Sequence, residues 1–294
     1  MTKREYIGII AAIVMIAILL IMWSVSLHRI VREERTVEVN GVPITYLVKG
    51  SSDGKPIVLL HGNGGSHQDL SVMINQLAQT GYLVWAPDSR GQGANPPLPE
   101  YHYTDMADDI HCFVEQVIIP FYEENENKEE SFASQIMQSA TSAINKKRLE
   151  VKESEPVKPV VFGWSDGGII ALLTEVRYPG TWSAIVTSGA NIDPDCGIWD
   201  LEEERAHPSD TSALYRMMLY EPNMTVEDMA TIQCPCLIAA GENDLISIEH
   251  THLIGDHIPH GQVLILQDED HGSHIYNSPI MGRVMLDYLE EIDY

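Results

Sequence analysis

Six short apolar runs constrain the fold of this chain more than any other feature of its sequence. A continuous apolar run of roughly four to eight residues predicts a strand that is buried on both faces of a sheet. Segments of helical character lie between the runs or follow the last one, at residues 69–80, 104–117, 167–177, 248–258 and 279–289. Strands that alternate with helices predict an α/β fold with helices on both faces of a mostly parallel sheet. The runs are "KPIVLLHG", "YLVWAPD", "PVVFGW", "WSAIVTSG", "PCLIAAGE" and "GQVLILQD".

A two-stranded hairpin is expected ahead of the first run. In "RTVEVNGVPITYLVKG", β-branched and polar residues alternate on both sides of Asn40 and Gly41. An Asn-Gly pair between two alternating segments predicts a tight hairpin turn. The chain of 294 residues suits one large domain. We expect this domain over residues 36–294.

Two segments interrupt the alternation of strands and helices. Residues 121–158 are rich in Glu, Lys, Ser and Asn, a composition that predicts a charged, partly helical insertion at the surface. Residues 191–231 lie between two core strands and carry aromatic and Met side chains. We expect this second segment to form a small helical cap above the sheet.

The N-terminus carries an uncharged apolar run at residues 7–27, with basic residues on both sides. A helix of roughly 20 apolar residues crosses the hydrocarbon core of a membrane. The sequence "MWSVSLHRIV" shows no convincing signal-peptide cleavage site, so a single-pass membrane anchor is expected within residues 1–30. The flanking charges are nearly balanced, which leaves the topology open, with the globular part outside the cytoplasm as the preferred arrangement.

The charge and the metal-binding residue types exclude several classes of partner. A net charge of −25 argues against nucleic acid, because binding phosphates requires a basic face. Four cysteines do not predict a disulfide framework in a chain of this length. Four histidines gather in "HTHLIGDHIPH" on an expected surface helix, but no pair of them has a convincing third and fourth ligand. We therefore expect no metal ion.

The stretch "VFGWSDGGIIALL" carries the strongest functional motif. Gly163, Ser165 and Gly167 match the pattern GxSxG between an expected strand and an expected helix. In that context a sharp turn exposes the serine hydroxyl, and small neighbours relieve the crowded backbone. The alternative is an ordinary turn or helix-cap serine.

A glycine-rich turn, "HGNGG", follows the first core strand. Glycines let backbone amides approach a ligand closely, as the stabilisation of an oxyanion requires. The expected donors of this oxyanion hole are the backbone amides of Asn63 and of Asp166, the residue after the serine.

A base and an acid follow the last two core strands. Asp244 comes just after "PCLIAAGE" and His271 just after "GQVLILQD". With Ser165 they form a candidate triad in which the imidazole takes the serine proton and the carboxylate orients the imidazole. The competing residues nearby are Glu242, Asp268, Asp270 and His274, of which His274 is expected at the surface or at the start of a helix.

Together these motifs resemble the α/β-hydrolase superfamily over residues 37–294. The resemblance rests on "HGNGG", "DSRGQG", "GWSDGG", "GENDLI" and "DEDHG", in this order and in these strand contexts. The phrase "GWSDGGIIALLTEVRYP" is similar to the valacyclovir hydrolase-like branch of esterases and amidases. The resemblance implies eight strands, a cap after the sixth strand, Ser165 as nucleophile, Asp244 as acid and His271 as base. The anchor and the insertion are not part of the family's common core.

The sequence thus predicts a membrane-anchored serine hydrolase without a cofactor. Its expected substrates are small-molecule esters with short or medium acyl groups, or amides or thioesters. Two alternatives remain: a cofactorless lyase or carbon-carbon bond hydrolase, and a noncatalytic membrane-tethered binding protein with a hydrolase fold. The sequence gives no indication of the oligomeric state.

Overall fold

The computed structural model describes residues 15–16, 30–125, 157–197 and 200–294. Its strands are β1 (Ile30–Val39), β2 (Val42–Ser51), β3 (Pro56–Leu60), β4 (Leu83–Pro87), β5 (Val160–Trp164), β6 (Ala184–Ser188), β7 (Cys236–Asn243) and β8 (Gly261–Asp270). Its α-helices are α2 (Ser71–Gln79), α3 (Tyr103–Phe113), α5 (Asp166–Arg177), α6 (Leu201–Ala206), α7 (Ala213–Tyr220), α8 (Val226–Met229), α9 (Ile248–Gly255) and α10 (Ile280–Glu291).

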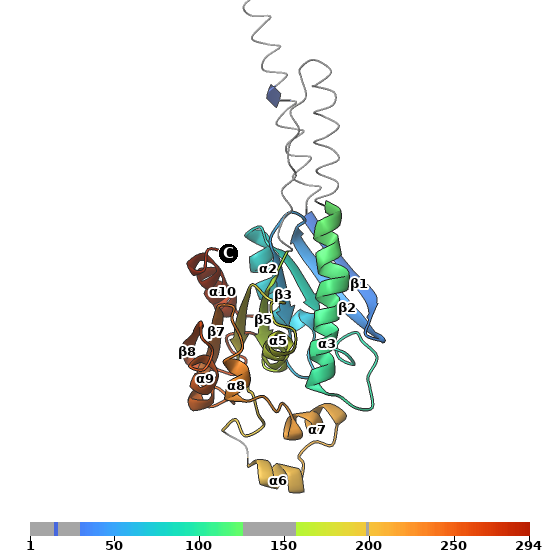
Figure 1. Ribbon diagram of the computed structural model, residues 1–294. Coiled ribbons are helices and arrows are strands. Elements are labelled where there is room, and N and C mark those ends of the chain that lie inside the picture. Colours follow the sequence, from blue (N-terminus) through green and yellow to red (C-terminus); the bar gives the residue numbers. More distant parts are fainter. Residues whose placement is uncertain (1–14, 17–29, 126–156, 198–199) are drawn as a thin grey trace, which may run out of the picture.

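The strands form one sheet in the order β1-β2-β4-β3-β5-β6-β7-β8 (Figure 1). Strand β2 pairs in antiparallel fashion with β1 and with β4, and all the other pairs are parallel. The α/β-hydrolase fold with a mostly parallel, eight-stranded sheet is therefore confirmed.

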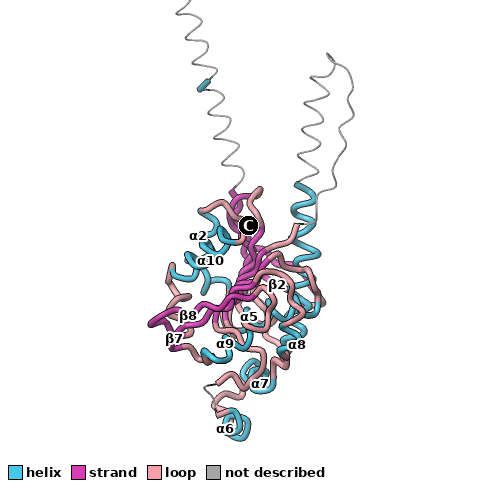
Figure 2. Tube along the Cα trace, turned by 60° about the vertical axis from the view of Figure 1, so that its left-hand side comes forward, coloured by secondary structure: helices cyan, strands magenta, loops and turns pink. Residues whose placement is uncertain are grey.

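Helices cover both faces of the sheet, which explains why the core strands are continuously apolar. Ile57 and Leu59 of β3 pack on the face covered by α2 and α10, whereas Val58 and Leu60 pack on the face covered by α3 and α5. Side chains of a strand point alternately to its two faces. When both faces are covered, every side chain of the strand is buried, so the whole run is apolar. Figure 2 shows the sheet between its two helical layers.

The hairpin at the N-terminal edge of the sheet is confirmed. Strand β1 pairs with β2 along its whole length, and the turn between them consists of Asn40 and Gly41, both with positive φ (49° and 77°). The sheet begins at Ile30, earlier than the domain boundary expected at residue 36.

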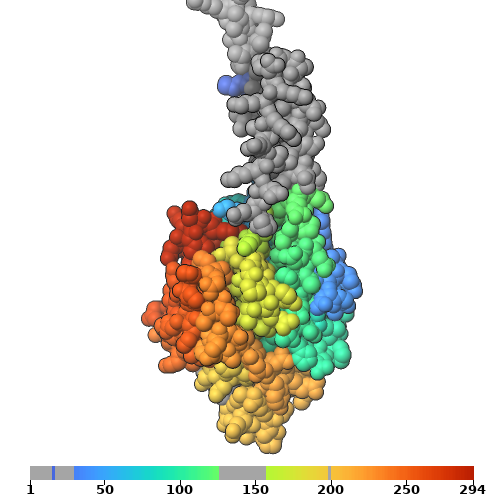
Figure 3. Space-filling model, in the orientation of Figure 1, coloured from blue at the N-terminus to red at the C-terminus, as the bar shows by residue number. Residues whose placement is uncertain are grey.

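The two interrupting segments differ in how much of them the structure describes. After α3 the helix continues through a π-helical turn (Val114–Ile118) to residue 125. Phe121 packs edge-on against Trp85, with ring centroids 5.2 Å apart, so the first residues of the expected insertion belong to the core. Residues 126–156 lie outside the described residues. The segment 191–231 contains α6, α7 and α8, and α6 and α7 form one end of the molecule (Figure 3).

The expected membrane anchor falls almost entirely outside the described residues. Of the apolar run at residues 7–27, the structure describes 15–16 alone. Within the described part of the chain, no helix combines the length and the apolar character needed to cross a membrane. The anchor therefore stays a prediction from the sequence.

Candidate active site

Ser165 lies in a sharp turn between β5 and α5. Its backbone angles are φ 54° and ψ −119°. Residues other than glycine rarely adopt this backbone conformation, because their Cβ atom causes steric strain there. Two backbone hydrogen bonds hold this turn: the Ser165 N–H donates to the carbonyl of Ser188 (2.8 Å), and its carbonyl accepts from the N–H of Gly168 (2.8 Å). The serine is thus fixed at the carboxyl edge of the sheet, where parallel α/β folds bind ligands.

The glycine that follows two residues later is required by close packing. A Cβ atom at Gly167 would lie 2.2 Å from the carbonyl oxygen of Leu60. Because any larger residue would push α5 away from β3, the second glycine of the GxSxG pattern sets how deeply the serine turn sits in the sheet.

Ser165, His271 and Asp244 come together in hydrogen-bonding geometry. His271 Nε2 lies 3.0 Å from Ser165 Oγ, and His271 Nδ1 lies 2.6 Å from Asp244 Oδ1. Ser165 follows β5, Asp244 follows β7 and His271 follows β8, and these three strands end at the same edge of the sheet. Gly189, after β6, makes room for the imidazole, since an added Cβ there would lie 2.7 Å from His271 Cε1.

Asp244 is placed to remain ionised. Burial by itself raises the pKa of its carboxyl, but the hydrogen bond and charge of His271 and the backbone amides of Ile246 and Gly241 outweigh burial. The pKa of Asp244 therefore lies below its ordinary value. A charged, fixed carboxylate is what an imidazole needs in order to keep its Nδ1 proton and to carry a transient positive charge.

The competing residues near His271 have other roles. Asp270 accepts hydrogen bonds from the N–H groups of Gly272 and Ser273 and so caps its own loop. The expectation that His274 lies at the surface or starts a helix is wrong, because it is fully buried and its Nε2 lies 2.6 Å from Ser188 Oγ. His274 thus supports the strand end that holds the backbone of Ser165.

The two residues expected to form the oxyanion hole are joined through their side chains. Asn63 Nδ2 donates to Asp166 Oδ2 (2.8 Å), which ties the glycine-rich turn to the N-terminus of α5. No acceptor for the backbone N–H of Asn63 or of Asp166 occurs among the contacts between described residues. The N-terminus of a helix also favours negative charge, so both amides suit the role expected of them.

The side chain of Asp166 is itself unusual. Burial raises the pKa of its carboxyl to about 6, against the opposing effect of hydrogen bonds from Tyr103 and Asn63. Tyr103 Oη donates to Asp166 Oδ1 (2.7 Å), and the backbone N–H of Tyr103 donates to Glu221 Oε2 (3.0 Å). Tyr103 therefore links the serine turn to the end of α7.

A small cavity of about 40 Å³ opens beside Ser165 and His271. Leu201 of α6 and Met218 of α7 contribute to its walls, so the segment expected as a cap does line the candidate site. Tyr103, Glu221 and Cys196 line it as well, and sequence reasoning missed all three. No local motif marks them, because their positions depend on how distant segments pack.

Cys196 is a potential second nucleophile in this cavity. Burial raises the pKa of its thiol to about 11, so the unreactive thiol form dominates at neutral pH. Ser165 is therefore the better candidate nucleophile of the two.

Comparisons with known proteins agree with the fold and with the type of enzyme. A family model described as "Alpha/beta hydrolase family" matches residues 57–224. The human protein "Serine hydrolase BPHL" is 25% identical over 282 residues, covering 86% of this chain and 85% of its own. Its mouse counterpart is 26% identical over 284 residues, with the same two coverages.

Solved structures resemble this chain at lower identity. A thermophilic esterase from Thermogutta terrifontis has a TM-score of 0.62 at 15% identity, covering 88% of this chain and 99% of its own. A meta-cleavage product hydrolase from Pseudomonas fluorescens has a TM-score of 0.60 at 19% identity, with coverages of 88% and 98%. These likenesses support the fold, and the family model spans more than half of the chain. We therefore conclude that the chain belongs to the alpha/beta hydrolase family and is an enzyme of the hydrolase type.

Proposed function

We propose that this protein is a serine hydrolase that cleaves carboxylic esters of small or medium acyl groups through an acyl-enzyme. The observation that carries the proposal is the unbroken chain of contacts from Ser165 Oγ through His271 to the buried Asp244. A serine nucleophile needs both a base within hydrogen-bond reach and a group that orients the base, and both are present beside a cavity.

The proposed reaction begins at Ser165. Its Oγ attacks the ester carbonyl while His271 Nε2 takes the hydroxyl proton, and Asp244 stabilises the resulting imidazolium. The carbonyl oxygen becomes an oxyanion that accepts hydrogen bonds from the backbone amides of Asn63 and Asp166. When the tetrahedral intermediate collapses, the carbon–oxygen bond to the alcohol breaks and His271 returns the proton to the leaving oxygen. Water then repeats the sequence on the acyl-enzyme and releases the acid.

The cavity walls support an acyl substrate. Leu201 and Met218 of the cap, together with Leu245 after β7, provide apolar surface, which suits a short or medium hydrocarbon chain. Amides and thioesters would follow the same steps, because His271 can protonate a nitrogen or a sulfur leaving group as well. The esterase named above shares the fold, and human BPHL is described as a serine hydrolase.

The test is covalent labelling of the full-length protein in mild detergent with a fluorophosphonate probe. Wild type should be labelled, and Ser165→Ala should lose all labelling and about 10⁵-fold or more in kcat on p-nitrophenyl butyrate. The matched control is Ser71→Ala, at the exposed start of α2, which should behave as wild type.

Three outcomes would refute the proposal. Full hydrolysis by Ser165→Ala would rule out the serine as nucleophile. Folded wild type that binds esters without turnover would point to a noncatalytic binding protein. Cleavage of a carbon-carbon substrate with no acyl-enzyme detectable by intact mass would favour the carbon-carbon bond hydrolase instead.

A further inference from the structure

Trp164, the last residue of β5, occupies the variable position directly before the nucleophile in the GxSxG pattern. Its side chain is 5% exposed and packs on the same face of the sheet as Phe162. An indole buried in this way brings a polar N–H into the interior, and such a donor needs an acceptor. The acceptor that it finds belongs to the proposed catalytic machinery.

The indole binds the backbone of the proposed base. Trp164 Nε1 donates to the carbonyl oxygen of His271 (2.8 Å). This bond fixes the main chain of His271 and leaves both ring nitrogens of the imidazole to Asp244 and Ser165. The Tyr276 ring packs edge-on against the indole, with ring centroids 4.8 Å apart, and is itself exposed to solvent.

The indole also packs on the turn that carries the proposed oxyanion donor. An added Cβ at Gly62 would lie 3.0 Å from Trp164 Cε3 and from Cζ3, so the six-membered ring is in direct contact with the backbone preceding Asn63. One rigid side chain therefore connects three separate loops: its own serine turn, the glycine-rich turn after β3 and the histidine loop after β8.

We propose that Trp164 is a positioning residue, which sets the distance and orientation of His271 and of the oxyanion donor Asn63 relative to Ser165. This inference rests on the proposed function, since a positioning residue matters only where these groups react. Errors of about 1 Å in the placement of reacting groups cost on the order of 100-fold in rate. The position before the serine, which the motif leaves free, thus becomes a determinant of rate.

The test compares two identical substitutions. Trp164→Phe removes the N–H and keeps an aromatic ring. Trp182→Phe is the matched control, because Trp182 is 1% exposed and its Nε1 donates to the carbonyl of Ala171 (3.1 Å). Trp182 lies just before the N-terminal end of β6, away from the site. Both variants lose one hydrogen bond from an indole N–H to a backbone carbonyl, so both should be destabilised to a similar extent.

The expected difference lies in catalysis. Trp164→Phe should lose about 30- to 100-fold in kcat and in the second-order rate of fluorophosphonate labelling, with KM unchanged within about threefold. Trp182→Phe should keep kcat within about twofold of wild type. Equal kcat values for the two variants would overturn the inference.

A second variant covers the case in which Trp164→Phe does not fold. Tyr276→Ala removes the ring packed on the indole, and Tyr276 is 49% exposed, so folding should survive. We expect a loss of about 5-fold in kcat because the indole is held less firmly, and wild-type kcat would count against the inference. Ser165→Ala, measured in parallel, separates the two proposals. If Ser165→Ala is still labelled, the proposed function fails. If Ser165→Ala loses labelling while the Trp164→Phe variant keeps wild-type kcat, the role of Trp164 alone is refuted.

Discussion

In the described part of the chain, the pairs His271–Asp244 and His67–Asp88 have nearly the same geometry. His271 Nδ1 lies 2.6 Å from Asp244 Oδ1, and His67 Nδ1 lies 2.8 Å from Asp88 Oδ1. Both aspartates are buried, and in both the pKa of the carboxyl lies below its ordinary value although burial alone would raise it. Judged by these contacts alone, either pair could support catalysis.

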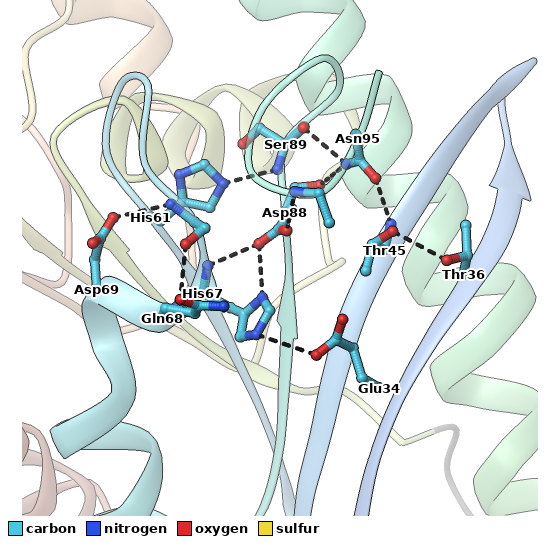
Figure 4. A network of polar contacts seen from close by, with 12 residues as sticks. Glu34, Thr36, Thr45, His61, His67, Gln68, Asp69, Asp88, Ser89 and Asn95 are labelled. Carbon is cyan, nitrogen blue, oxygen red and sulfur yellow. Dashed lines mark hydrogen bonds and ion pairs between the residues drawn. The ribbon is translucent and has the colours of Figure 1, made fainter. Parts of the chain in front are cut away.

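The pairs differ in what faces the second ring nitrogen. His271 Nε2 faces the hydroxyl of Ser165 at 3.0 Å, whereas His67 Nε2 faces the carboxylate of Glu34 on β1 at 4.0 Å (Figure 4). The hydrogen bond with Asp88, helped by the charge of Glu34 and opposed by burial, raises the pKa of His67 above its ordinary value. His67 is therefore suited to hold a proton in an ion pair between two carboxylates.

The comparison teaches that a histidine–aspartate pair can act in catalysis only where a third group exchanges a proton with the histidine. With a hydroxyl as the third group, the pair can move a proton in each cycle. With a second carboxylate, the pair becomes a structural link between three segments. Glu34 lies on β1, His67 just before α2, and Asp88 just after β4. Asp88 strengthens this link by accepting the backbone N–H groups of His67 and Ala94.

The largest expected effect comes from deleting each histidine. His271→Ala should lower kcat by about 10⁵-fold or more with a near-native stability, because the base is lost from the surface of the cavity. His67→Ala should keep kcat within about threefold and lose about 3 kcal/mol of unfolding free energy, since Asp88 is left buried without its partner. Ester hydrolysis and urea unfolding of both variants check this, and a large loss of kcat in folded His67→Ala would break the comparison.

The next effect concerns the carboxylates. Asp244→Asn should lower kcat by about 10³- to 10⁴-fold, because an amide cannot stabilise the imidazolium or fix its tautomer. Asp88→Asn should leave kcat within about threefold but weaken the fold by about 2 to 3 kcal/mol, because charged hydrogen bonds become neutral ones. The same assays distinguish the variants, and equal kcat values would show that the two pairs are interchangeable.

The smallest effect is in the pH dependence of stability. The folded pKa of His67 is raised, so the stability that its ion pair contributes is fully present below the ordinary histidine pKa of about 6.5. That contribution is lost as the pH rises through the folded pKa. Unfolding free energies of wild type should therefore fall more steeply above pH 6.5 than those of His67→Gln. Parallel curves would mean that the pKa of His67 is the same in the folded and the unfolded protein.

Much of the fold could be predicted from the sequence because its signals are local. Each core strand is a continuous apolar run, and the tight turn at Asn40 and Gly41 is encoded by two adjacent residues. The grouping of Ser165, Asp244 and His271 followed from their strand ends, since parallel strands end at the same edge of a sheet. Their catalytic roles remain proposals that the variants above test.

The rest depends on contacts between distant segments. Tyr103 reaches Asp166 across 63 positions, and its N–H reaches Glu221 across 118. Motifs in the sequence describe residues that are close along the chain, so they do not predict contacts of this kind. His274 shows the same limit from the other side, because a histidine in a polar loop reads as exposed until the packing around Ser188 is known.

The size of the cavity beside Ser165 has a consequence for the timing of turnover. About 40 Å³ accommodates roughly three water molecules, so we expect α6 and α7, which line the cavity, to move aside for a substrate with a medium acyl chain. That motion has a rate of its own, and where it is slower than acylation it limits kcat. Esters that share an acyl chain but carry good and poor leaving groups would then turn over equally fast. Opening of the cap, and not the chemical steps, would then limit the rate of turnover.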